Sequence, residues 1–247
     1  MRTLGKREIS PKKWGAICDY DKHRYSHSVK GCAAWYGTWR PRTRVIHWGG
    51  SNPYNVATPD DAMRVMRGID RYHVRNRLWS AAAYNRAFGG GAMLRVRGAH
   101  PNGAHTNSGV HGEITDACLF LVAHPTETPL WIDRHNFAVY QLADPLPVVG
   151  HGSYPEQSTQ CPGPWLDKWI DRKGWVEDFG EWAVGDKGYA VRAIRRRLRD
   201  LGYRVYPWRQ RYTNKVRKTV ARYQRDQGLP VSGVVDAATY RALTNLP

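Results

Sequence analysis

Val148-Val149-Gly150-His151 is a short apolar run that ends in glycine and histidine, and Cys161-Pro162-Gly163 begins ten residues after that histidine. The apolar run predicts a buried strand that ends at His151, and the Pro-Gly pair predicts a turn that holds Cys161 in place. Arg44 to Trp48 predicts another buried strand, with His47 near its end. Two strands that end in histidine, with a fixed cysteine, indicate an α/β domain with a candidate metal site at the strand ends.

Helices and strands alternate along the first two thirds of the sequence, which is typical of an α/β domain. Thr58-Pro59-Asp60-Asp61 predicts a helix start, because threonine can cap a helix, proline suits its first position and acids favour its first turn. We expect this helix to run to about Arg77. The other expected elements are strands at 81–87, 93–96, 118–122 and 148–151, a turn at 89–91, a loop at 98–113, and helices at 130–142 and 164–170.

The pattern changes towards the C-terminus. From Val191 to Leu201 apolar residues recur at helical spacing, and Gly202 follows as a stop signal. Thr213 and Asp236 can each cap a further helix. Three short helices in this stretch predict a small all-α domain.

We therefore expect an α/β domain with a mixed central sheet flanked by helices, followed by a small three-helix domain. The predicted boundaries are residues 1–170 for the first domain, with its core at about 40–170, residues 171–182 for a linker and residues 183–247 for the second domain.

The composition is strongly basic, with 38 Lys and Arg against 21 Asp and Glu and a formal net charge of +17. Residues 180–247 hold 15 of these basic residues and only 5 acidic ones. Such a charge predicts an anionic partner, and nucleic acid, anionic lipid and anionic cell-wall polymer all qualify. No stretch approaches the roughly 18 apolar residues of a membrane span, and the polar start from Met1 to Lys13 predicts no signal peptide.

The cysteine pattern contains no CxxC pair. Cys118 lies in an apolar run and is expected to be an inert core residue. Cys18 and Cys32 can pair or stay free, and the sequence leaves that choice open.

His47, His151 and Cys161 form a candidate zinc set. Zinc binds imidazole nitrogen and thiolate sulfur readily, and catalytic sites use three protein ligands plus a water. By residue type alone, the same three residues are also compatible with two ordinary histidines and a structural cysteine.

The residues around this set follow a specific order. The segments are Val45-Ile46-His47, Ala83-Tyr84-Asn85, Gly103-Ala104-His105, Gly150-His151 and Thr159-Gln160-Cys161-Pro162-Gly163. Over roughly residues 40–170, this order resembles the type-2 N-acetylmuramoyl-L-alanine amidases, a family that includes phage lytic enzymes and animal peptidoglycan-recognition proteins. The resemblance implies one Zn²⁺ per chain, held by His47, His151 and Cys161.

The resemblance also implies roles for residues near the metal. Tyr84 matches a tyrosine that these amidases place beside the zinc, and Thr159 falls where many members have lysine or threonine, so both are predicted catalytic residues. Asn85 and His105 are predicted to bind substrate, His105 from a loop that often lines the groove. By residue type alone, Tyr84 is also compatible with a half-buried strand aromatic and His105 with a surface histidine.

These residue types suit amide hydrolysis. Two neutral imidazoles and one thiolate leave a zinc site with net positive charge, which lowers the pKa of bound water. A tyrosine hydroxyl at Tyr84 can donate to a developing oxyanion, and Thr159 can add a neutral hydrogen bond. Some family members carry a glutamate on the strand where this chain has Leu119-Phe120-Leu121. The general base therefore stays open, with Glu113 and Asp116 as candidates.

The C-terminal stretch resembles the three-helix peptidoglycan-binding domain over nearly all of residues 183–244. The segments that carry this resemblance include Leu201-Gly202-Tyr203, Tyr223-Gln224 and Gly233-Val234-Val235. Arg195-Arg196-Arg197 is compatible either with a solvated helix face or with contact to wall polymers.

Together the two resemblances imply a zinc amidase that cuts the bond between N-acetylmuramic acid and L-alanine in bacterial peptidoglycan, as a phage endolysin that lyses its host. The expected partners are peptidoglycan and its associated anionic wall polymers, with no nucleic acid and no membrane span, and the chain is expected to be a monomer. We expect synthesis in the host cytoplasm and action on the wall after holin-dependent release. The alternatives are a non-catalytic peptidoglycan-recognition protein and a basic nucleic-acid-binding protein.

Overall fold

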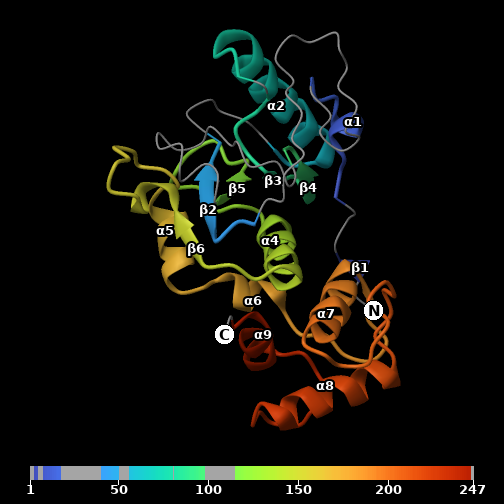
Figure 1. Cartoon of the computed structure of the whole chain (residues 1–247). Coiled ribbons are helices and arrows are strands. Elements are labelled where there is room, and N and C mark those ends of the chain that lie inside the picture. The colour runs from blue at the N-terminus through green and yellow to red at the C-terminus, as the bar shows by residue number, and fades with distance from the viewer. Residues whose placement is uncertain are drawn as a thin grey trace. The chain divides into compact units, whose positions relative to one another are not determined.

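The computed structural model of the chain describes residues 3–4, 8–17, 40–49, 56–79, 81–97 and 115–245. The chain divides into two compact units, and Figure 1 labels the helices and strands of both. The sheet unit comprises residues 8–133 and 147–172. The helical unit comprises residues 1–7, 134–146 and 173–247, so it is assembled from three separate stretches of the sequence.

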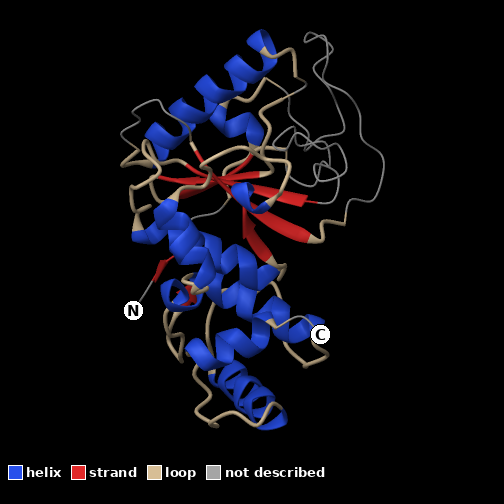
Figure 2. Cartoon of the chain, turned by 90° about the vertical axis from the view of Figure 1, so that its left-hand side faces the viewer, coloured by secondary structure: helices blue, strands red, loops and turns tan. Residues whose placement is uncertain are grey.

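A five-stranded mixed sheet forms the centre of the sheet unit, drawn in red in Figure 2. Its strands lie in the order β4-β3-β5-β2-β6. The β3–β4 pair is antiparallel, whereas β3–β5, β2–β5 and β2–β6 are parallel. The strands are β2 (Thr43–Trp48), β3 (Arg86–Gly89), β4 (Ala92–Arg95), β5 (Thr115–Phe120) and β6 (Val148–Gly150). The predicted α/β domain with a mixed sheet is confirmed.

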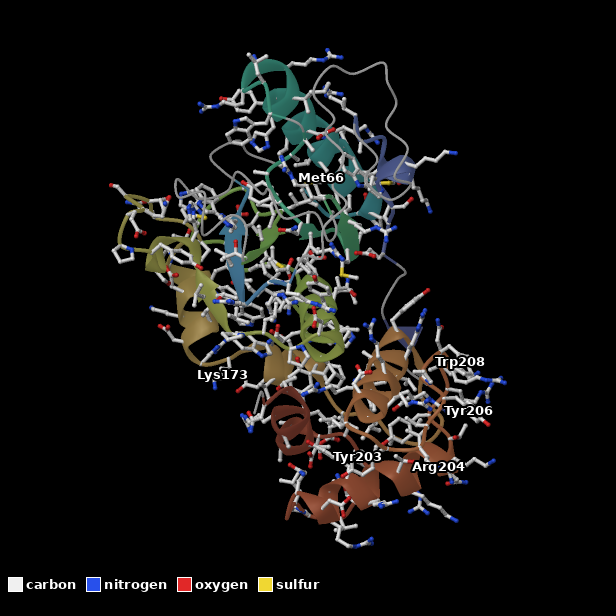
Figure 3. The ribbon with its side chains drawn as sticks, in the orientation of Figure 1. Met66, Lys173, Tyr203, Arg204, Tyr206 and Trp208 are labelled. Atoms are coloured by element: carbon white, nitrogen blue, oxygen red, sulfur yellow. The ribbon has the colours of Figure 1, made fainter. Side chains whose placement is uncertain are left out.

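Helix α2 (Pro59–Arg71) covers one face of this sheet. Its start follows the predicted signals, because the hydroxyl of Thr58 accepts a hydrogen bond from the backbone N–H of Asp61, and the Asp61 carboxylate accepts one from the backbone N–H of Thr58. Met66 of α2, labelled in Figure 3, packs in a buried cluster that includes Leu119 of β5.

Helix α5 (Pro164–Asp171) packs on the other face. Phe120 follows Leu119 in β5, so the two side chains point to opposite faces of the sheet. The ring of Phe120 meets the fully buried ring of Trp169 in α5 edge-on, with the centroids 5.6 Å apart. Both faces of β5 are therefore covered within the sheet unit.

Two predicted elements differ from those observed. A strand was expected at 81–87, but the observed strand runs from Arg86 to Gly89. Residues 81–85 follow an irregular path, because the Arg97 guanidinium donates hydrogen bonds to the carbonyls of Ala81 and Ala82. The helix expected to reach Arg77 changes hydrogen-bonding pattern after Arg71 and continues as a π-helix, η1 (Tyr72–Asn76).

The helical unit contains the predicted three-helix domain. Asp236 caps the last of these helices, since its carboxylate accepts a hydrogen bond from the backbone N–H of Thr239, whereas Thr213 precedes α8 without a side-chain cap. None of the described helices is long and apolar enough to cross a membrane. The three helices are α7 (Tyr189–Asp200), α8 (Asn214–Asp226) and α9 (Ala237–Thr244), and β1 (Thr3–Leu4) pairs with β7 (Lys187–Gly188) beside them.

Two further helices contribute to the core of this unit. The fully buried Tyr240 of α9 donates its hydroxyl to the carbonyl of Ala138 in α4 (Trp131–Ala143) at 2.8 Å. Its ring lies 4.5 Å from that of Phe179 in α6 (Trp175–Phe179). Helix α6 falls within residues 171–182, which were expected to form a linker. The buried aromatic residues of that stretch explain the difference, because burying them stabilises a packed helix over an extended connection.

Candidate metal centre

Strand register brings the two predicted histidine ligands together. In the parallel β2–β6 pair, Ile46 lies opposite Gly150. The next residue along each strand is a histidine, so His47 and His151 stand side by side at the carboxyl ends of these strands, with ring centroids 4.4 Å apart. The carboxyl ends of parallel strands are where α/β sheets commonly place their ligand sites.

Cys161 joins the two histidines from the loop that precedes α5. Its Sγ lies 3.7 Å from Nδ1 of His47, and one ligand atom from each of the three residues lies within 4.8 Å of the others. Tetrahedral zinc, with bonds of about 2.0 Å to nitrogen and 2.3 Å to sulfur, separates such ligand atoms by about 3.6 Å. The donor set and its spacing therefore fit one zinc ion with a fourth position left for water or substrate.

Close packing of glycines positions the cysteine. A Cβ atom on Gly150 would lie 2.7 Å from Cδ of Pro162, and one on Gly163 would collide with Pro125. The backbone N–H of Gly152 also donates to the carbonyl of Cys161 at 2.6 Å. Gly150 thus lets the Cys161 loop lie directly against the end of β6, and Gly163 lets the same loop pass close to Pro125.

Gln157 orients His151 and was not singled out by the sequence. Nε2 of His151 donates to the side-chain carbonyl of Gln157 at 3.1 Å, which leaves Nδ1 of the same ring as the free ligand atom. Such a partner on the second ring nitrogen is the usual way in which proteins fix the tautomer of a metal-binding histidine. The only sequence signal was its position inside the loop between His151 and Cys161.

The electrostatics of the cluster suit a cation. Burial raises the pKa of the Cys161 thiol to about 12, against the opposing effect of a hydrogen bond from the backbone of Trp48. Burial also lowers the pKa of His151, which favours the neutral imidazole that a metal requires. A divalent cation would supply the positive charge that a buried thiolate needs. The cluster therefore favours metal binding over proton transfer from Cys161 to one of the two histidines.

Tyr84 lies beside this cluster. Its ring meets that of His47 edge-on, with the centroids 5.3 Å apart. His73 of η1 stands 6.1 Å from Tyr84 and 4.7 Å from Trp79, so an aromatic group extends away from the histidines. The structure thus places Tyr84 beside one of the three candidate ligands, His47, and its catalytic role stays a prediction.

Thr159 and Asn85 make backbone contacts near the site. The hydroxyl of the exposed Thr159 accepts a hydrogen bond from the backbone N–H of Cys161 at 3.1 Å, which steadies the cysteine loop. Asn85 is fully buried, and its side-chain carbonyl accepts a hydrogen bond from the backbone N–H of Ala117 in β5 at 2.9 Å. The Asn85 amide therefore ties a neighbouring segment to the sheet, and its predicted role in substrate binding stays a prediction.

Asp116, one of the two candidates for a general base, is not the register partner of His47. The register partner of His47 is the buried Leu119, one of the three apolar residues that stand where some amidases carry a glutamate. Asp116 lies three residues earlier in the strand and forms a buried ion pair with Arg44, at 2.7 Å between Nε and Oδ2. Glu113 lies outside the described residues, as does the predicted substrate-binding residue His105.

Two cysteines are free in the described part of the chain, Cys118 in the core of β5 and Cys161. Cys118 is fully buried, which agrees with an inert core residue. Cys18 and Cys32, whose pairing was left open, lie outside the described residues.

A family model supports the C-terminal assignment. Residues 187–243 match the family described as "Putative peptidoglycan binding domain". This match covers α7, α8 and α9 with the loops between them. No curated protein matches the sequence.

Solved structures of peptidoglycan recognition proteins share the fold of the larger part of the chain. Wild-type Drosophila PGRP-LB superposes with a TM-score of 0.55 at 22% identity, covering 67% of this chain and 92% of its own. A tyrosine-to-phenylalanine variant of the same protein, in complex with tracheal cytotoxin, has a TM-score of 0.55 at 22% identity, and the match covers 68% of this chain and 95% of that chain. Bumblebee PGRP-SA has a TM-score of 0.51 at 18% identity, and the match covers 68% of this chain and 95% of that chain. The mixed sheet with its flanking helices thus has the fold of the peptidoglycan recognition proteins, and the helices after it match a peptidoglycan-binding domain.

Proposed function

We propose that this protein is a zinc-dependent N-acetylmuramoyl-L-alanine amidase, which hydrolyses the amide between N-acetylmuramic acid and L-alanine in bacterial peptidoglycan. The observation that carries the proposal is the cluster of His47, His151 and Cys161 at the carboxyl ends of β2 and β6. The same cluster stands in a fold shared with the peptidoglycan recognition proteins, one of which was solved with the peptidoglycan fragment tracheal cytotoxin.

The metal and the protein would divide the chemistry between them. When bound, zinc supplies positive charge that polarises an amide carbonyl and lowers the pKa of water. His47, His151 and Cys161 would hold the ion, and Gln157 would keep the His151 ring in the tautomer that presents Nδ1.

Tyr84 would serve as a hydrogen-bond donor in the reaction. Its ring meets that of the candidate ligand His47 edge-on, which supports this role. A phenol there can donate to the oxyanion that forms when the amide carbonyl is attacked. Thr159, exposed beside Cys161, would add a neutral hydrogen bond to the substrate or its stem peptide.

The C-terminal domain would anchor the enzyme to its substrate. Its match to a peptidoglycan-binding family and its excess of 15 basic over 5 acidic residues in 180–247 both support attachment to a polyanionic cell wall. An enzyme with one catalytic and one wall-binding domain is the arrangement expected of a phage endolysin that reaches the wall from the host cytoplasm by way of a holin.

The decisive experiment is digestion of purified peptidoglycan followed by mass spectrometry of the soluble products. An amidase releases free peptides with new L-alanine amino termini and leaves glycan strands uncut. New reducing sugar ends without new amino termini would replace the proposal with a glycosidase. No cleavage by zinc-loaded protein that still binds walls would establish the non-catalytic recognition protein.

A further inference from the structure

A basic pocket lies in the helical unit, on the side of the loop between α7 and α8 where Figure 3 labels Arg204, Tyr206 and Trp208. It has a volume of about 610 Å³ and is lined by residues of α7, α8 and this loop. No acidic residue lines it. The cations that line it are Arg195, Arg199, Arg204, Arg209, Arg211 and Lys215.

These six cations have no acidic partner among the residues that the structure describes. The ion pairs of the same helices join other residues, Arg196 to Asp200 and Arg222 to Asp226. Asp200 and Asp226, the acidic residues of α7 and α8, are therefore paired with arginines that do not line the pocket. A concave surface with several uncompensated positive charges concentrates its field in the pocket and attracts anions.

Arg195 is a buried side chain that is held in a fixed position in the wall of this pocket. The residue is 5% exposed, and its guanidinium donates only to backbone carbonyls, to that of Arg211 at 2.7 Å and 3.2 Å and to that of Tyr206 at 3.2 Å. These bonds hold both ends of the 206–211 loop without neutralising the charge. A buried guanidinium without a carboxylate is costly on its own, and an anion in the pocket would compensate it.

A second basic pocket adjoins the first. It has a volume of about 410 Å³ and is lined by Lys187, Gly188, Arg209, Gln210 and Arg211. Because Arg209 and Arg211 line both pockets, the two form one continuous basic surface. Such a surface suits an extended ligand that carries charge at intervals more than a single small anion.

Exposed aromatic rings stand at the same place. Tyr206, which lines the first pocket, is 63% exposed, and Trp208 is 62% exposed with its ring centroid 5.6 Å from that of Tyr206. Two large aromatic side chains that are exposed side by side form an apolar patch, and such patches can mark a binding site. Their faces can pack against the apolar face of a sugar or polyol unit while arginine forks bind the anionic groups between such units.

We propose that these adjoining pockets bind a phosphodiester-linked glycan or polyol polymer of the cell wall, in addition to the peptidoglycan that the domain is proposed to hold. The proposal rests on the proposed function for the choice of the wall as target. Arginine binds phosphate oxygens in a bidentate manner. The seven cations that line the two pockets carry more positive charge than the few carboxylates of one peptide stem can neutralise. A repeating phosphodiester supplies this charge along one strand.

The test is sedimentation of the full-length chain with purified Gram-positive walls, before and after hydrofluoric acid has removed their phosphodiester polymers. A chelator is present throughout, so the walls stay intact and the result does not depend on amidase activity. We expect the apparent Kd to rise about tenfold on stripped walls. Soluble glycerol-phosphate oligomer should compete for intact walls, whereas soluble peptidoglycan fragments should not displace this part of the binding.

Paired variants locate the site. Arg204→Gln with Arg209→Gln removes two pocket cations, and Arg225→Gln with Arg241→Gln removes two exposed arginines outside both pockets for the same change in net charge. The pocket variant should bind intact walls about tenfold more weakly and stripped walls as the wild type does, while the control variant keeps wild-type binding to both. Equal losses in the two variants, wild-type binding that does not weaken when the walls are stripped, or preferential binding of single-stranded DNA over walls would overturn the proposal.

Discussion

The Sγ of Cys161 lies 3.7 Å from Nδ1 of His47, although 114 positions separate the two residues in the sequence. The parallel register of β2 and β6 sets His47 beside His151, and the lack of a side chain on Gly150 lets the cysteine loop close against them. Backbone topology, more than any direct interaction among the three side chains, therefore produces the cluster.

Replacing Cys161 with alanine should abolish stoichiometric zinc binding. The wild-type chain is expected to bind one zinc ion, because three ligand atoms lie within 4.8 Å of one another and removal of the thiolate leaves only two ligands. Metal analysis of protein purified without added zinc measures the ratio. Cys118→Ala is the control, since Cys118 is buried in β5 away from the ligand set, and zinc retained in Cys161→Ala would rule out this site.

Replacing Gly150 with alanine should weaken both folding and zinc binding. The added Cβ would lie 2.7 Å from Pro162 and 2.9 Å from the Asp167 carboxylate, so the Cys161 loop must move away from β6. We expect a loss of about 1–3 kcal/mol in the free energy of unfolding, measured in urea, together with lower zinc affinity. At Gly68 of α2 nothing lies within 4 Å of an added Cβ, so Gly68→Ala should stabilise the protein by up to about 1 kcal/mol. Tight zinc binding in Gly150→Ala would show that the close approach is not required.

Replacing Tyr84 with phenylalanine should keep the zinc and lower turnover. The ring that packs on His47 is retained, and only the hydroxyl that can donate to an oxyanion is lost. Removing such a donor costs about a hundredfold in kcat. Tyr72→Phe is the matched control on η1, where the tyrosine is 48% exposed. Wild-type turnover in Tyr84→Phe would assign Tyr84 to packing alone.

His73 should make the sheet unit sensitive to mild acid. Burial, with help from Arg97 and Arg77, lowers its pKa from 6.5 to about 4, and its neutral Nδ1 accepts a hydrogen bond from the backbone N–H of Ala83 at 3.2 Å. The unfolded chain binds a proton at His73 more readily than the folded chain does. Stability is therefore full above pH 6.5 and falls as the pH drops towards 4.

The expected loss at His73 is about 1–2 kcal/mol, because partial exposure of the ring reduces the effect. Urea unfolding between pH 7 and pH 4 measures it. His73→Asn keeps a hydrogen-bond acceptor and removes the titration, so its stability should change less over this range. Parallel pH profiles for the two proteins would assign the acid sensitivity to other groups.

The sequence predicted the centre of the molecule better than its edges. The apolar runs that end near His47 and His151 predicted β2 and β6, and the Pro162-Gly163 pair predicted the turn that follows Cys161. These local signals succeeded because the residues that produce them are also the ones that the sheet buries or packs closely. The start of α2 was predicted for the same reason, since its cap is formed by residues that are neighbours in the chain.

Features that depend on distant contacts were missed. The segment at 81–85 leaves the strand because Arg97, from beyond the hairpin, holds its carbonyls. Helix α6 is stabilised by packing against Tyr240 of α9, which no local pattern reveals. The basic pocket was also missed, because Arg195 was visible only as part of an arginine run, and its burial depends on the carbonyls of Tyr206 and Arg211.

The hydrogen bond from Tyr240 to the carbonyl of Ala138 spans 102 positions and has a practical meaning for protein engineering. A cut near residue 172 would transplant α9 without the α4 turn that its tyrosine contacts, leaving a buried hydroxyl without its acceptor at a cost of about 1–3 kcal/mol. A graft of this module needs a replacement for that helix or a Tyr240→Phe substitution, or the recipient will carry a weakened fold.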